Sequence, residues 1–164
     1  MHLQALEWIR AHATTEEVAV LDLGGRNVNG TPRRLFPAAA PYRVLDIADG
    51  PGVDIVADAA TWEPDRVYDV VVCAEVLEHT PAWRDILATA HRAAREGSRL
   101  ILTTAAPGRP VHSGIDGRPQ LHPGEHYANI EPAELLTALQ AAGWRQVVID
   151  VRHHPNDVRA TAVR

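Results

Sequence analysis

The sequence contains no lysine and only one cysteine among its 164 residues. All sixteen basic residues are arginines, which excludes a Schiff-base lysine and the lysine of a phosphate-binding P-loop. Cys73 has no second cysteine for an internal disulfide or for a Cys-x-x-Cys zinc site. A single thiol is typical of a reducing compartment, so we expect a cytoplasmic protein.

Long apolar runs and an excess of positive charge are also missing. No stretch approaches the roughly 18 apolar residues of a membrane span, and the first residues do not resemble a signal peptide. A formal net charge of -5 does not favour duplex nucleic acid as a partner. With 46% hydrophobic residues the chain can bury one core, so we expect a single domain over residues 1–164.

Short apolar runs rich in β-branched residues recur along the first two thirds of the chain. Runs that are continuous rather than alternating are typical of a parallel sheet covered on both faces. Between the fourth and fifth runs, Thr80, Pro81 and Gly97 mark the start and the end of a predicted helix. The five predicted strands lie at 18–21, 42–45, 54–57, 68–72 and 99–103.

The remaining segments complete an α/β pattern. Helices are predicted near residues 3–9 and 132–143, and the chain ends in a predicted hairpin formed by 146–151 and 158–163. Strands that alternate with helices indicate a three-layer αβα sandwich. Residues 105–129 contain four prolines, four glycines and three histidines without periodicity, which predicts a lid or a binding loop.

Polar or small residues follow four successive predicted strands. The first strand contains Asp22 and leads into Gly24 and Gly25, and Asp46 follows 24 residues after Asp22, at the end of the second strand. An acid about 20 residues beyond a glycine-rich turn is where nucleotide-binding sheets hold a ribose diol. The carboxyl ends of parallel strands share one edge, so these residues are expected to line one crevice. The residues at the ends of the third and fourth strands are Asp58, Ala59, Cys73, Ala74 and Glu75.

On these ordered motifs the chain resembles the class I S-adenosylmethionine-dependent methyltransferases. The resemblance implies a Rossmann-like, mostly parallel seven-stranded sheet with an antiparallel last strand, and S-adenosylmethionine as the cofactor. It places the amino-acid part of the cofactor at residues 22–25, the ribose at Asp46 beside Ile47, the adenine at 58–59, and the reacting centre beside 73–75. The family's later glycine positions hold Arg26 and Val28 here, so the side chain of Asn27 or Asn29 is expected to replace a backbone contact.

The charge balance of this region agrees with a cationic cofactor. Residues 41–80 include nine acidic residues and two arginines. Such a crevice repels a pyrophosphate and tolerates a sulfonium. Arg26, by contrast, could reach the cofactor carboxylate or remain solvated.

Methyl transfer from a sulfonium is a direct displacement, so alignment can supply most of the catalysis, and a hydroxyl acceptor also needs a base. We expect His126 to be that base, with Glu75 and His79 beside the transfer point. Two interpretations of the Glu-x-x-Glu-His run stay open. Either Glu75 and Glu78 cap the following helix, or Glu75, Glu78, His79 and His126 bind a divalent metal. We assign no metal.

The sequence therefore predicts methyl transfer from S-adenosylmethionine to oxygen or nitrogen of a small-molecule acceptor, covered by residues 105–129. An NAD(P)-dependent oxidoreductase on a similar sheet and a non-catalytic cofactor-binding partner protein are the alternatives. Neither a membrane nor duplex nucleic acid is an expected partner.

Overall fold

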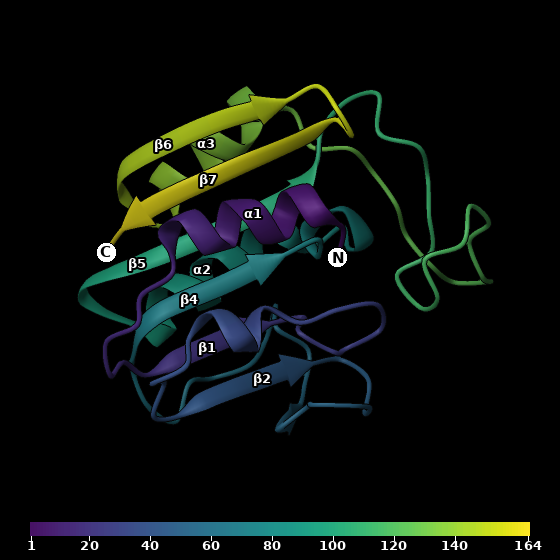
Figure 1. Cartoon of the computed structure of the whole chain (residues 1–164). Coiled ribbons are helices and arrows are strands. Elements are labelled where there is room, and N and C mark those ends of the chain that lie inside the picture. The colour runs from purple at the N-terminus through teal and green to yellow at the C-terminus, as the bar shows by residue number, and fades with distance from the viewer.

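A mixed seven-stranded sheet runs through the centre of the molecule, in the order β3-β2-β1-β4-β5-β7-β6 (Figure 1). The computed structural model describes all residues 1–164. Strands β1 to β5 are parallel, and β7 is antiparallel to both of its neighbours, β5 and β6. This confirms the predicted sheet and its antiparallel last strand. The strands are β1 Val20–Leu23, β2 Tyr42–Asp46, β3 Ile55–Val56, β4 Tyr68–Ala74, β5 Ala94–Ala105, β6 Arg145–Arg152 and β7 Asp157–Val163.

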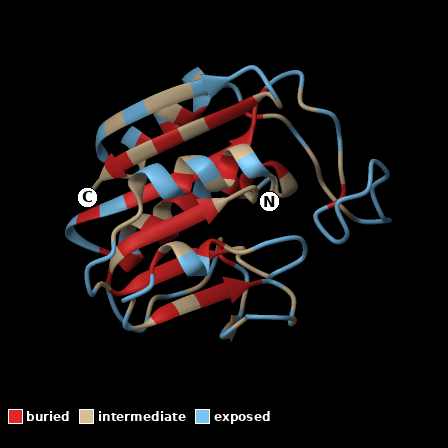
Figure 2. Cartoon of the chain, viewed as in Figure 1, coloured by how far each residue is buried: buried red, intermediate tan, exposed pale blue.

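Helices cover both faces of the sheet. Helix α1 (Leu3–His12) lies across one face, and α2 (Trp83–Ala93) and α3 (Pro132–Ala141) lie on the other (Figure 1). Alternate residues of the central strands enter two separate apolar clusters. Val70 and Val72 join the cluster on the α1 side, whereas Val71 and Cys73 join the larger cluster that contains α2 and α3. The central strands are therefore buried on both faces, as the continuous apolar runs predict (Figure 2).

The predicted limits of the helix before β5 are wrong at both ends. A 3-10 helix, η2 (Leu77–His79), comes first, and the N-cap of α2 is Ala82, not Thr80. Helix α2 ends at Ala93, and β5 starts at once with Ala94 pairing with Tyr68. Gly97, with φ of +80°, lies within β5, where the pairing with β4 shifts register. Its positive φ serves this irregularity in the strand and does not end the helix.

The terminal hairpin and the irregular loop match their predictions. Strands β6 and β7 pair along their length, and the chain between residues 106 and 131 forms neither helix nor strand. This segment leaves the carboxyl end of β5 and extends beyond the sheet (Figure 1). None of the helices combines the length and the hydrophobicity that crossing a membrane requires.

Candidate functional site

A cavity of about 910 Å³ lies at the carboxyl ends of β1, β2 and β4, within the size range of small-molecule sites. Residues predicted to bind the cofactor form much of its lining. Cys73 does not line it, because its side chain is fully buried in the α2 side of the core, where burial raises the pKa of the thiol. The predicted residues that do line the cavity are Asp22, Gly24, Gly25, Asn29, Asp46, Ile47, Asp58, Ala59, Ala74 and Glu75.

The turn after β1 presents backbone to the cavity because no side chain fits there. Gly24 has φ of +69°, and a Cβ added to it would lie 2.3 Å from Cγ2 of Val76. A Cβ on Gly25 would lie 2.5 Å from Cγ of Asp22. Any larger residue would therefore displace the turn or its neighbours. The pair leaves space for a ligand to approach the main chain closely.

The side chain of Asp22 packs against this turn at Gly25. It is 1% exposed and accepts a hydrogen bond of 2.8 Å from the Tyr42 hydroxyl. Burial raises the pKa of its carboxyl to about 7, against the partly compensating hydrogen bond from Tyr42. With this pKa the carboxyl group is only partly ionised near neutral pH.

Asp46 has a carboxylate whose direction is fixed by the main chain. Its Oδ2 accepts from the backbone N–H of Arg26 at 3.1 Å, and its Oδ1 accepts from that of Ala48 at 3.0 Å. Each carboxylate oxygen can accept a second donor, and Asp46 lines the cavity. The neighbouring Ile47 is 74% exposed and offers an apolar surface. Together they fit a ribose diol with an adjacent flat base.

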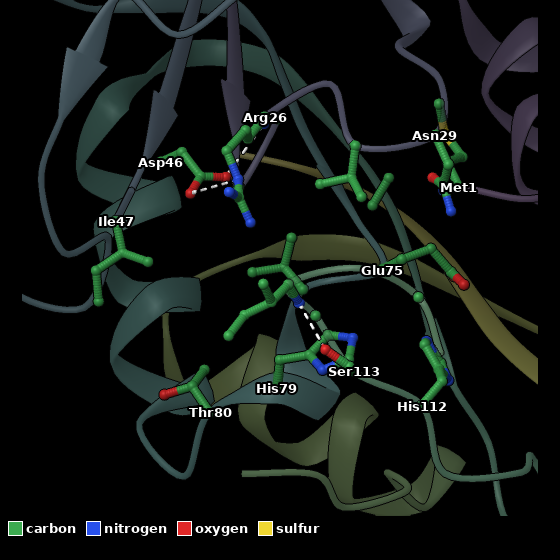
Figure 3. Close-up of a pocket in the computed structure, with 18 of the residues that line it drawn as sticks. Met1, Arg26, Asn29, Asp46, Ile47, Glu75, His79, Thr80, His112 and Ser113 are labelled. Atoms are coloured by element: carbon green, nitrogen blue, oxygen red, sulfur yellow. Dashed lines mark hydrogen bonds and ion pairs between the residues drawn. The ribbon is translucent and has the colours of Figure 1, made fainter. Parts of the chain in front are cut away.

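Arg26 neither extends into solvent nor lies apart from the acids. Its Nε is 3.9 Å from Oδ1 of Asp46, and its side chain lies beside that carboxylate at one end of the cavity (Figure 3). The same Nε is buried without a hydrogen-bond partner. Arg26 therefore balances the charge of Asp46 at this end of the cavity.

Glu75 belongs to a network of four charged groups. Its Oε1 accepts from Thr103 at 3.0 Å, and its Oε2 accepts from Arg109 at 3.2 Å and lies 3.1 Å from Nε2 of His2. Arg109 and His2 both also pair with the fully buried Asp157. Burial raises the pKa of Glu75, but His2, Arg109 and Thr103 outweigh it and hold the pKa below its usual range. The ionised carboxylate of Glu75 thus holds His2 and Arg109 in place.

Sequence reasoning missed three members of this network, namely His2, Arg109 and Asp157. They come from the start of α1, the loop after β5 and the start of β7. Burial lowers the pKa of His2, yet its hydrogen bonds to Asp157 and Glu75 raise it to about 9. His2 is therefore protonated at neutral pH. The network therefore connects two segments that line the cavity, the start of the chain at His2 and the loop at Arg109, to Glu75 at the end of β4.

Neither glutamate of the Glu-x-x-Glu-His run caps α2, whose N-cap has no side-chain hydrogen bond. Glu78 is fully buried and accepts from Thr104 Oγ1 at 2.7 Å, and burial raises its pKa to about 8. His79 lines the cavity, and burial lowers its pKa to about 4. At neutral pH the run therefore presents one engaged carboxylate, Glu75, followed by a protonated acid and a neutral imidazole.

The loop after β5 brings further rings to this wall. His112 lines the cavity, and its ring centroid lies 5.1 Å from that of His79 and 5.0 Å from that of Tyr127. His126, the expected base, does not line the cavity. The set Glu75, Glu78, His79 and His126 is therefore not gathered into one group. Arg26 and Asp46 lie at one end of the cavity, and His79 lies at the other (Figure 3).

The two ends of the cavity differ in chemistry. The strand-end side offers main-chain groups and the fixed carboxylate of Asp46, which suit an adenosyl group. The opposite side offers the imidazoles of His79 and His112 and loop residues, among them Val111 and Ile115, which are large and exposed. The cavity can therefore hold two ligands next to each other.

Comparison with known proteins agrees with this arrangement. A family model described as a methyltransferase domain matches residues 5–148. The ubiquinone biosynthesis O-methyltransferase of Burkholderia thailandensis is 30% identical over 175 residues, which span 92% of this chain and 75% of the relative. Two solved structures share the fold at lower identity. The complex of DhpI with SAH has a TM-score of 0.71 at 23% identity. The match spans 96% of this chain and 81% of the DhpI chain.

The second solved structure is the Burkholderia thailandensis 1,6-didemethyltoxoflavin-N1-methyltransferase with bound 1,6-didemethyltoxoflavin and S-adenosylhomocysteine. It has a TM-score of 0.72 at 17% identity and covers 98% of this chain and 76% of its own. The family model spans most of the sequence, and the curated relative aligns along nearly all of it. The chain belongs to the class I S-adenosylmethionine-dependent methyltransferases.

Proposed function

We propose that this protein transfers a methyl group from S-adenosylmethionine to an oxygen or nitrogen atom of a small-molecule acceptor. The observation that carries the proposal is that one cavity joins the fixed carboxylate of Asp46 to a wall that holds the imidazoles of His79 and His112. The named relatives include an O-methyltransferase and an N1-methyltransferase. None of them favours an oxidoreductase or a non-catalytic partner protein. We keep the cytoplasm as the expected location.

The strand-end half of the cavity would hold the cofactor. The two oxygens of Asp46 would accept the ribose hydroxyls, with Ile47, Asp58 and Ala59 around the adenine. The backbone of Gly24 and Gly25, with Asp22, Asn29, Ala74 and Glu75 nearby, would hold the amino-acid part. When bound, S-adenosylmethionine supplies an electrophilic methyl group on a positively charged sulfur. The acidic surroundings stabilise that charge.

The protein's own contribution is chiefly alignment and exclusion of water. Alignment of the two reactants alone can supply up to about 7–11 kcal/mol in favourable systems. Residues 105–129 would cover the acceptor, since loop residues 109–115 line the cavity. Of the three expected catalytic residues, Glu75 is engaged with Arg109 and Thr103, and His126 does not line the cavity. His79 would contact the acceptor as a neutral ring.

Calorimetric titration tests the cofactor, and product detection tests the reaction. S-adenosylhomocysteine should bind with a micromolar dissociation constant, whereas NAD⁺ should give no binding heat. The protein should also convert S-adenosylmethionine to S-adenosylhomocysteine when catechol or 1,6-didemethyltoxoflavin is added, with one methyl group gained by the acceptor. Binding of NAD⁺ in place of S-adenosylhomocysteine would reject the proposal. Binding without turnover of a wider acceptor panel would favour the non-catalytic alternative.

A further inference from the structure

We propose that His112 is the proton acceptor of this reaction, with its Nε2 atom taking the proton that the acceptor hydroxyl or amine loses. The inference rests on the proposed methyl transfer and adds a residue that lies outside the expected catalytic set. His112 lies in the loop after β5 and lines the cavity. Three observations carry the inference: the tautomer of its ring, the way the ring is held, and the state of the other imidazoles.

A hydrogen bond within the loop determines the tautomer of His112. Its Nδ1 lies 3.2 Å from the carbonyl oxygen of Pro110. A carbonyl oxygen can only accept, so Nδ1 must carry the hydrogen. A neutral imidazole has one N–H group, which leaves a free lone pair on Nε2. The same carbonyl would stabilise the ring after Nε2 has gained a proton, because Nδ1 continues to donate to it.

The ring of His112 is held on two sides. It meets the His79 ring at 84° and the Tyr127 ring at 65°, both in edge-to-face contact. The Tyr127 hydroxyl donates at 3.2 Å to the same Pro110 carbonyl that His112 uses. No hydrogen bond within the chain engages Nε2 of His112. The nitrogen is thus oriented while its lone pair stays available.

The other imidazoles near the cavity are less suited to this task. Burial lowers the pKa of His79 to about 4, and its Nδ1 is covered, without a partner, beneath Gly114. His126 does not line the cavity. His122 lies 3.1 Å from Asp116 at the exposed part of the loop. His2 also lines the cavity, but it is paired with Glu75 and Asp157. A weak base, a distant one and two ion-paired ones therefore leave His112.

The titratable groups around His112 come from η2 and from the loop itself. His79 of η2 and Tyr127 of the loop contact its ring, and a carboxylate oxygen of buried Glu78 lies within 4.8 Å of its nearer nitrogen and that of His79. Glu125 and His126 act on the same region through His79. The groups nearest a proton gained by His112 are thus the neutral imidazole of His79, the phenol of Tyr127 and the protonated carboxyl of Glu78.

The proposed step conserves every bond pair and the proton. A lone pair on the acceptor oxygen or nitrogen forms the new bond to the methyl carbon, and the carbon–sulfur bond breaks with its electron pair left on sulfur. The O–H or N–H bond of the acceptor breaks with its electron pair left on the acceptor atom. The proton goes to Nε2 of His112, and the imidazolium then releases it to solvent.

Kinetics of His112→Ala test the assignment, with His122→Ala as the matched control in the same loop. With catechol as the acceptor, we expect kcat of His112→Ala to fall about 10²- to 10³-fold. The dissociation constant of S-adenosylhomocysteine should stay within about twofold, as expected when only the acceptor side is changed. Added imidazole should restore part of the lost rate. His122→Ala and His126→Ala should behave as wild type.

Three kinetic results would overturn the inference. His112→Ala could keep wild-type turnover, His126→Ala could lose it instead, or imidazole could fail to restore any rate to an otherwise folded variant. Loss of wild-type turnover on chelation, with recovery on adding magnesium, would also overturn it. Activation of the acceptor by a metal would then replace proton transfer to His112.

A second measurement needs no acceptor. Long-range ¹H–¹⁵N spectra of the wild-type protein, assigned with His112→Ala, should show His112 as the Nδ1–H tautomer near neutral pH. Finding the Nε2–H tautomer would reject the inference even if no tested acceptor turned over. Failure to bind S-adenosylhomocysteine would instead reject the proposed function, so the two failures are distinguishable.

Discussion

Replacing Asp46 with asparagine should weaken S-adenosylhomocysteine binding about 30- to 150-fold without unfolding the protein. Both carboxylate oxygens of Asp46 already accept one backbone N–H, from Arg26 at 3.1 Å and from Ala48 at 3.0 Å. Their remaining lone pairs are available to a ligand bound in the cavity, which Asp46 lines. An asparagine side chain has one oxygen and one NH₂ group, so it keeps only one of these two acceptor positions.

The magnitude follows from the hydrogen bonds lost. A hydrogen bond to a charged group contributes about 1.5–3 kcal/mol. Losing one ribose contact and the charge on the other gives about 2–3 kcal/mol, and each 1.4 kcal/mol is a tenfold change in the dissociation constant. The amide also opposes one backbone N–H, which costs folding about 1 kcal/mol. Binding should thus suffer more than stability.

Asp54→Asn is the matched control. The Asp54 carboxylate accepts from Val44 N–H at 2.8 Å and from Arg33 at 3.0 Å, but it does not line the cavity. Isothermal titration and calorimetric melting of both variants separate the two effects. Asp54→Asn should lose stability and keep its affinity. An Asp46→Asn protein that binds S-adenosylhomocysteine within threefold of wild type would refute the ribose assignment.

Three further substitutions test the turn and the two buried ionisable networks. In Gly24→Ala the new Cβ would lie 2.3 Å from Val76, whereas in Gly52→Ala the positive φ is the sole obstacle. Gly24→Ala should therefore lower the free energy of unfolding by at least about 2 kcal/mol more than Gly52→Ala, as measured by urea denaturation. Glu78 has a pKa of about 8 against 4.5 in the unfolded chain, so wild-type stability should fall as the pH rises from 4.5 to 8. Glu78→Gln should reduce that slope most between pH 7 and 8, above the pKa of about 7 of the other buried acid, Asp22. His2, with its pKa raised from 6.5 to about 9, stabilises the fold fully below pH 6.5, and this contribution is lost as the pH rises through 9. His2→Gln should therefore lower the melting temperature at pH 6 but not at pH 10, with any tag kept at the C-terminus.

Opposite results would identify the wrong step in each case. Equal losses for Gly24→Ala and Gly52→Ala would mean that the turn relaxes away from Val76. An unchanged slope between pH 7 and 8 in Glu78→Gln would assign the whole pH dependence to other groups, such as Asp22, whose pKa is about 7. A pH-independent loss in His2→Gln would show that His2 acts through its N-cap contact with α1 and not through its charge.

Strands were predictable from the sequence because they are buried on both faces. Continuous apolar runs occur where both sides of a strand need cover, and each of the five predicted runs overlaps an observed strand. The helix before β5 was less predictable. Thr80 and Pro81 are good start signals, but the preceding residues form η2, and α2 begins only after Ala82. Local signals could not reveal that Gly97 belongs to an irregular strand.

Most of the cavity-lining residues at the strand ends were predictable from the sheet topology. Cys73 is the exception, and the alternation of side chains along a strand explains it. Cys73 and Val71 lie two residues apart in β4 and enter the same apolar cluster, so Cys73 faces the core. The network of Glu75 with His2, Arg109 and Asp157 could not have been found in this way. Its members His2 and Asp157 are 155 residues apart in the sequence, and only the assembled fold brings them together.

The choice among the histidines of the loop shows what kind of information was missing. His112, His122 and His126 share one proline-rich segment without periodicity, so nothing in their spacing ranks them. Their difference lies in hydrogen bonds. Pro110 lies two residues before His112, and its carbonyl oxygen accepts a hydrogen bond from Nδ1 of His112. His122 instead lies against Asp116. A short-range Pro-x-His contact thus determines which imidazole keeps a free nitrogen beside the cavity, and it becomes informative only once the loop is known to line that cavity.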